Sequence, residues 1–135
     1  MNGINRSTED VFNHHMDAFL RKDLKDLATD FNEKSIFITS TGEKRIGVDA
    51  ISDAYSQIFQ SLEQGSAFDL KQVNIEDDIV FLEWTLKSPS ININDGVDTF
   101  VIRDGSIHAQ TVRYSMMQEA VAGQPQSSPD SHSIS

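Results

Sequence analysis

Asp98 is the residue whose type and position point most clearly to chemistry. It lies in an otherwise apolar run, residues 97–102, and strand alternation places it on the same side as Phe100 and Ile102. A buried carboxylate without a partner is penalised in its ionised form, so it persists with hydrogen bonds, with a cation or for a function. Asp98 is therefore a candidate acid or base in a pocket. In the alternative, structural interpretation, backbone amides or an arginine would pair with it, and the candidate arginines are Arg45, Arg103 and Arg113.

His15 is the second candidate for acid–base chemistry. It follows Phe12 by three residues and precedes Phe19 by four, which places it on or beside the apolar stripe of a helix. A half-buried histidine titrates near neutrality and can serve as acid or base, whereas the alternative is a core-edge histidine bonded to a neighbour. His14 points about 100° away from it on a helix, so the two could not readily bind one metal ion. The sequence predicts no metal site.

The other pocket candidates are aromatic or polar side chains on largely apolar segments, a combination typical of ligand pockets. They are Phe12, Phe19, Phe37, Thr39, Tyr55, Phe59, Trp84, Phe100, Gln110 and Tyr114. Glycine-rich nucleotide motifs, Gly-x-Ser-x-Gly and His-Glu-x-x-His do not occur in the sequence. We therefore expect no cofactor.

Composition limits the class of partner. The chain has 135 residues, a formal net charge of -10 and no cysteine. That length suits one domain, and the acidic balance offers no basic stripe for nucleic acid or for an anionic membrane surface. The lack of cysteine fits a reducing compartment, and the first residues lack the apolar stretch of a secretory signal, so the expected location is cytoplasmic.

Helices should come first and strands later, which indicates an α+β domain over residues 8–117. Apolar periodicity predicts helices over residues 8–21, from a cap at Asp23 to residue 31, and over 47–62. Strands are predicted over 35–40, 67–75, 79–87, 96–102 and 106–115, with the last four antiparallel neighbours and a type I′ turn at Asp104-Gly105. The acidic clusters at 23–30 and 76–78 read as solvated carboxylates. Residues 1–7 and the polar tail 118–135 should be disordered.

Three motifs in this order resemble the nuclear transport factor 2-like superfamily, and more closely its SnoaL-like bacterial members. Residues 16–24 look like the family's helix-one ending, 46–51 like its Gly-x-x-Ala-Ile helix start, and 98–107 like its Asp-x-Phe-x-x-x-Asp-Gly-x-Ile hairpin. The resemblance implies a cone-shaped, cystatin-like α+β barrel in which a curved antiparallel sheet wraps three N-terminal helices. It also implies a pocket between helices and sheet, and a homodimer formed through the sheet.

Function varies within this fold. Ketosteroid isomerases resemble the chain in outline: their oxyanion-hole aspartic acid aligns with Asp98, their tyrosine donor with His15 and their base with Thr39, which cannot act as that base. SnoaL-like polyketide cyclases look similar in using an acidic residue in the strand region of Asp98, but often carry an acidic residue and a tryptophan where this chain has Ala109 and Thr111.

The resemblance thus implies a small hydrophobic, carbonyl-containing ligand, with cofactor-free isomerase, cyclase or dehydratase chemistry through Asp98 and His15. The alternative is a noncatalytic sensor or dimeric accessory domain, which the loss of the base at Thr39 would suit.

Overall fold

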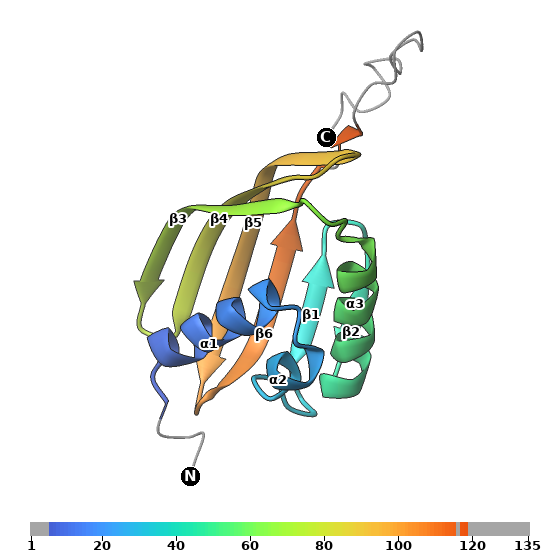
Figure 1. Cartoon of the computed structure of the whole chain (residues 1–135). Helices are drawn as coiled ribbons and strands as arrows, with labels where there is room; N and C mark the ends of the chain where they lie inside the picture. The colour runs from blue at the N-terminus through green and yellow to red at the C-terminus, as the bar shows by residue number, and fades with distance from the viewer. Residues whose placement is uncertain (1–5, 116, 119–135) are drawn as a thin grey trace, which may run out of the picture.

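The computed structural model describes residues 6–115 and 117–118 as helices on one face of a curved mixed sheet (Figure 1). The helices are α1 (Thr8–Leu20), α2 (Leu24–Ala28) and α3 (Val48–Ser61). The strands are β1 (Ile36–Thr39), β2 (Lys44–Ile46), β3 (Ala67–Glu76), β4 (Ile79–Lys87), β5 (Ile91–Arg103), β6 (Ser106–Arg113) and β7 (Met117–Gln118). The segments predicted to be disordered, residues 1–7 and 118–135, lie outside the described residues except for Arg6, Ser7 and Gln118. No helix in the described part of the chain is long and apolar enough to cross a membrane.

Side-chain caps in the sequence mark the starts of α1 and α2. Ser7 and Asp10 form the reciprocal hydrogen bonds of a capping box at α1, and Asp23 caps α2 through the backbone N–H of Asp26. Gly47 precedes α3 with a φ of 95°, a left-handed conformation that glycine adopts without strain. In chain order α1 and α2 come before the sheet, whereas α3 follows β1 and β2.

The sheet order is β2-β1-β6-β5-β4-β3, with β7 paired to β5. The predicted antiparallel pairing of β3, β4, β5 and β6 is confirmed, and Asp104 and Gly105 both have positive φ, as a type I′ turn requires. Register shifts interrupt β3–β4, β4–β5 and β5–β6, and such bulges bend a sheet.

Two expectations about the sheet need correction. The sheet is not wholly antiparallel, because β1 pairs in parallel with β6, so that Phe37 lies opposite Gln110. It is also not a closed barrel, since β2 and β3 form its two ends in the strand order. The sequence could not show the parallel pair, because a helix and four strands separate its members and no turn fixes their direction.

The largest differences from the predicted strands occur at two places. The short β2 was not predicted, since two of its three residues are the charged Lys44 and Arg45. β5 begins at Ile91 and not at residue 96. The prediction missed residues 91–95 because asparagine, aspartate and glycine at 92–96 have low strand propensity. Packing of Ile93 in the core outweighs that propensity.

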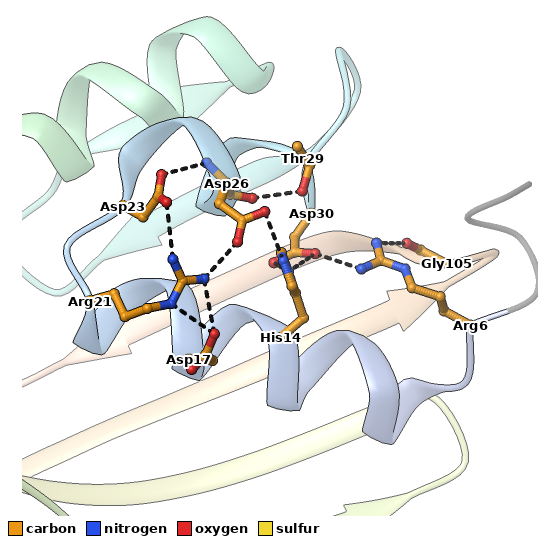
Figure 2. A network of polar contacts seen from close by, with 9 residues as sticks. All are labelled: Arg6, His14, Asp17, Arg21, Asp23, Asp26, Thr29, Asp30 and Gly105. Carbon is orange, nitrogen blue, oxygen red and sulfur yellow. Dashed lines mark hydrogen bonds and ion pairs between the residues drawn. The ribbon is translucent and has the colours of Figure 1, made fainter.

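A polar network ties the start of the chain to α1, to the end of α2 and to the β5–β6 turn (Figure 2). Arg6 Nη1 lies 2.9 Å from Asp30 Oδ1, and Arg6 Nη2 donates to the carbonyl oxygen of Gly105 at 2.6 Å. His14 reaches Asp30 Oδ2 at 2.8 Å and Asp26 Oδ1 at 3.0 Å. Asp30 is fully buried, so the prediction that the 23–30 cluster is solvated is wrong for this member.

The charged groups in this network shift one another's pKa values. Burial raises the pKa of Asp30, against the opposing hydrogen bonds and charges of His14 and Arg6. Burial lowers the pKa of His14, but Asp30 and Asp26 outweigh it, so the net pKa of His14 is raised. Protonated His14 therefore helps to neutralise the buried carboxylate of Asp30.

Candidate functional site

A cavity of about 310 Å³ lies between α1, α3 and the inner face of the sheet. Nine of the twelve predicted site residues line it: His15, Phe19, Phe37, Thr39, Tyr55, Trp84, Asp98, Gln110 and Tyr114. Most of the other lining residues are apolar, while Thr41, Glu43 and several other polar side chains complete the wall. The cavity thus combines apolar walls with a few converging polar groups, as ligand sites do.

Three predicted residues lie outside the lining: two are in the core, and the third is partly buried and packs against it. Phe12 packs edge-on against Phe100, with ring centroids 5.6 Å apart, and both are buried. Phe59 contacts the rings of Phe19 and Tyr55. Helical spacing and strand alternation predicted the inward side of each residue, but not its depth. These rings support the residues that line the cavity.

The sheet register brings two hydrogen-bond donors to Asp98. Asp98 on β5 lies opposite Leu82 of β4 and Val112 of β6, so Trp84 and Gln110, two residues along, share its face. Trp84 Nε1 donates to Asp98 Oδ1 at 2.9 Å, and Gln110 Nε2 donates to Oδ2 at 3.0 Å. The side chain of Asp98 points inward, as alternation predicted, and the residue is 8% exposed.

No arginine pairs with Asp98 among the described residues. Arg45 pairs with Glu43, Arg103 with Asp78 and Arg113 with Asp95. Burial raises the pKa of Asp98 to about 6, although the hydrogen bonds from Trp84 and Gln110 act in the opposite direction. A carboxyl group that titrates this close to neutrality can both take up and return a proton.

His15 is linked to Asp98 through two intervening side chains. Its Nε2 lies 3.4 Å from the Tyr55 hydroxyl, and that hydroxyl donates to Gln110 Oε1 at 3.0 Å. Gln110 in turn donates to Asp98. Burial, with a smaller effect of neighbouring His14, lowers the pKa of His15 to about 3, so its imidazole is uncharged at neutral pH. The ring also contacts Phe31, Tyr55 and Phe100 edge-on.

Several lining residues were not predicted to be there. Phe68 and Leu86 face each other across the β3–β4 pair, and Ile91 and Ile93 come from the part of β5 that was expected to be a loop. The apolar alternation of 91 and 93 was the available signal, but the intervening asparagines obscured it. Met16 lines the cavity from α1, one position from His15.

Gly96 allows Trp84 to lie flat against β5. A Cβ atom added at Gly96 would come within 2.2 Å of the Trp84 ring. We expect Gly96→Ala to displace the indole, to weaken its hydrogen bond to Asp98 and to destabilise the fold by about 1–3 kcal/mol, as overpacking does. Trp84 is the only tryptophan in the sequence, so its fluorescence maximum should shift in this variant. An unchanged spectrum together with unchanged stability would contradict this prediction.

Comparisons with known proteins agree with this architecture. The sequence matches a family model, the SnoaL-like domain, over residues 12–110. A comparison with curated proteins found no significant match.

Solved structures show the same fold at low sequence identity. An NTF2-like protein of unknown function from Burkholderia xenovorans superposes with a TM-score of 0.69 at 16% identity, over 90% of this chain and 95% of that one. A candidate ketosteroid isomerase from Kribbella flavida has a TM-score of 0.68 at 14% identity, with coverages of 88% and 83%. A candidate SnoaL-like polyketide cyclase from Shewanella putrefaciens has a TM-score of 0.65 at 16% identity, with both coverages 79%. The matched domain covers most of the chain, and the chain belongs to the SnoaL-like family.

Proposed function

We propose that the cavity binds a small, uncharged and largely apolar carbonyl compound, and that Asp98 exchanges a proton with the carbon beside that carbonyl. The observation that carries this proposal is a buried carboxylate, facing an apolar cavity, whose hydrogen-bond partners are neutral donors. A cation would neutralise a structural carboxylate, but the three arginines that the sequence offered for this role pair with other carboxylates.

The charges of the lining favour an uncharged ligand. Its ionisable acids include Asp98 and Glu43, it contains no lysine or arginine among the described residues, and His15 is uncharged. A ligand carboxylate or phosphate would lose its hydration and face a like charge. The apolar walls suit a hydrocarbon ring or chain.

The chemistry that fits this site needs no group beyond the protein's own side chains. The ionised carboxylate of Asp98 removes a proton from the carbon beside the ligand carbonyl, and the electron pair of the broken C–H bond moves to form an enolate. Return of the proton to a different carbon would be isomerisation. The hydroxyl groups of Thr39 and Tyr114 line the cavity and are donors suited to the enolate oxygen. A homodimer through the sheet and a cytoplasmic location belong to this proposal, carried by the resemblance and the sequence.

The proposal predicts that the protein catalyses hydrogen–deuterium exchange beside the carbonyl of a bicyclic enone in D₂O, measured by proton NMR. Asp98→Asn should lower the exchange rate by roughly 100-fold or more, because general acid–base groups contribute about that much. The matched control is Asp69→Asn, since Asp69 is an exposed carboxylate on β3 outside the cavity lining. Its exchange rate should equal that of the unaltered protein.

Binding is followed separately through Trp84, whose indole lines the cavity. A saturable fluorescence change without deuterium exchange would contradict the catalytic role and favour the noncatalytic sensor. A change in neither signal across a series of enones of different ring number would contradict the carbonyl ligand itself.

A further inference from the structure

The hydrogen bonds that link His15 to Asp98 all point in one direction. Tyr55 has a single hydroxyl hydrogen, and it donates to Gln110 Oε1. Towards His15, therefore, the Tyr55 oxygen can only accept, so the hydrogen of the neutral imidazole must lie on Nε2. Gln110 presents its N–H to Asp98, and Trp84, which can only donate, occupies the other carboxylate oxygen.

His15 Nδ1 explains why this direction is stable. It is buried and has no hydrogen-bond partner within the described part of the structure. In the Nε2–H tautomer it is a bare acceptor. If the donors and acceptors of these hydrogen bonds were exchanged, the imidazole hydrogen would move to Nδ1 and a donor would be buried without an acceptor. Such orphaned buried N–H groups are rarer in proteins than under-satisfied acceptors.

We propose that His15, Tyr55 and Gln110 are positioning residues. They form a hydrogen-bond chain that keeps one direction, so that a proton taken up by Asp98 points into the cavity. With the chain fixed, Gln110 offers Asp98 only an N–H. The protonated carboxyl then has no acceptor on the side of Gln110 or of Trp84, and its hydrogen must face the ligand. This inference rests on the proposed function for the use of that proton, but the direction of the chain is a property of the protein without ligand.

Two titratable groups outside the hydrogen-bond chain, His14 and Asp30, affect the pKa values of its members. His14, the neighbour of His15 on α1, lowers the pKa of His15, an effect smaller than that of burial. Burial raises the pKa of Tyr55, as do the charges of Asp98 and, more weakly, Asp30. His15 and Tyr55 therefore both stay neutral while Asp98 changes charge.

The first test is nitrogen-15 NMR of histidine-labelled, ligand-free protein between pH 5 and pH 8. We expect His15 to show a protonated Nε2 and a bare Nδ1 throughout, while Asp98 titrates across the same range. An Nδ1–H tautomer, or a tautomer that changes as Asp98 titrates, would overturn the proposal, since the chain would then be reversed or free to reverse.

The second test measures the pKa of Asp98 from its side-chain carbon shift in Tyr55→Phe. Without the hydroxyl, Gln110 can turn its carbonyl towards Asp98 and stabilise the protonated form, which should raise proton affinity about tenfold. Ser61→Ala is the control, because Ser61 lines the same cavity outside the hydrogen-bond chain and loses a hydroxyl that donates to the carbonyl oxygen of Ile58, and it should leave that pKa unchanged. An equal pKa in both variants would reject the positioning role. Neither test uses a ligand, so failed deuterium exchange with a fixed tautomer would reject only the proposed chemistry.

Discussion

Replacing Asp98 by asparagine should raise the free energy of unfolding by about 2 kcal/mol at pH 7.5, although the variant loses its ionisable group. Burial raises the pKa of Asp98 from 3.8 to about 6, so ionisation costs the folded state about 3 kcal/mol at neutral pH. Asparagine can still accept from Trp84, but Gln110 must rotate to accept from its amide, which offsets about 1 kcal/mol. The midpoint of thermal unfolding should rise by roughly 8 °C.

The pH dependence identifies the cause. Because the folded pKa of Asp98 lies above the unfolded one, its favourable contribution is fully present below pH 3.8 and is lost as pH rises through about 6. The stability advantage of Asp98→Asn should therefore be largest above pH 7 and disappear between about pH 4 and pH 5. In stronger acid the variant should be the less stable protein, because only the cost of rotating Gln110 remains. Denaturant unfolding at each pH measures this difference in stability. The titration of His15 does not contribute to it, because both proteins contain His15. A variant that is less stable at pH 7.5, or an advantage that persists in acid, would contradict the burial of an unneutralised charge.

Arg6→Met should destabilise the fold by about 2–3 kcal/mol at pH 8. Removing one partner of a buried ion pair leaves an uncompensated charge, which costs about 3–5 kcal/mol when the site is fully enclosed. Asp30 is fully buried, but Arg6 and His14 both reach solvent, so the expected cost is at the lower end. Arg6 also holds the carbonyl of Gly105 in the β5–β6 turn.

The same variant should be less destabilised in mild acid. The folded pKa of His14 is raised, so its stabilising charge is present below its unfolded value of 6.5 and is lost as pH rises through the folded pKa. Without Arg6, Asp30 depends on His14 alone, and stability should fall more steeply with pH. Arg103→Met is the control, because it removes an exposed ion pair with Asp78, and its thermal midpoint should stay constant. Equal losses in the two variants would contradict a special role for the buried carboxylate.

The inward direction of Asp98 was predictable because alternation and a two-residue turn are local properties. Asp104 and Gly105 determine where the hairpin turns, and counting back from the turn assigns each side chain of β5 to a face. The helix caps Ser7 and Asp23 follow from equally short patterns. Family motifs then extended these local predictions to the whole fold.

The partners of Asp98 could not be predicted, because they depend on register across three strands. Bulges at 84–86 and 101–102 shift that register by amounts that no local pattern encodes. Trp84 and Gln110 were predicted to line the pocket, but not to bind the same carboxylate. The burial of Asp30 was missed for a similar reason, since Arg6 and Gly105 are distant from it in sequence.

The parallel pairing of β1 with β6 determines when the cavity can form during folding. Phe37 and Gln110 become neighbours only after a loop of more than seventy residues has closed, and such non-local contacts form slowly. Until β6 docks, the edge of β1 is unpaired on that side and the apolar wall around Phe37 lacks its neighbour. During synthesis this edge stays unpaired until residues 106–113 leave the ribosome, so the cavity is among the last parts of the described structure to form.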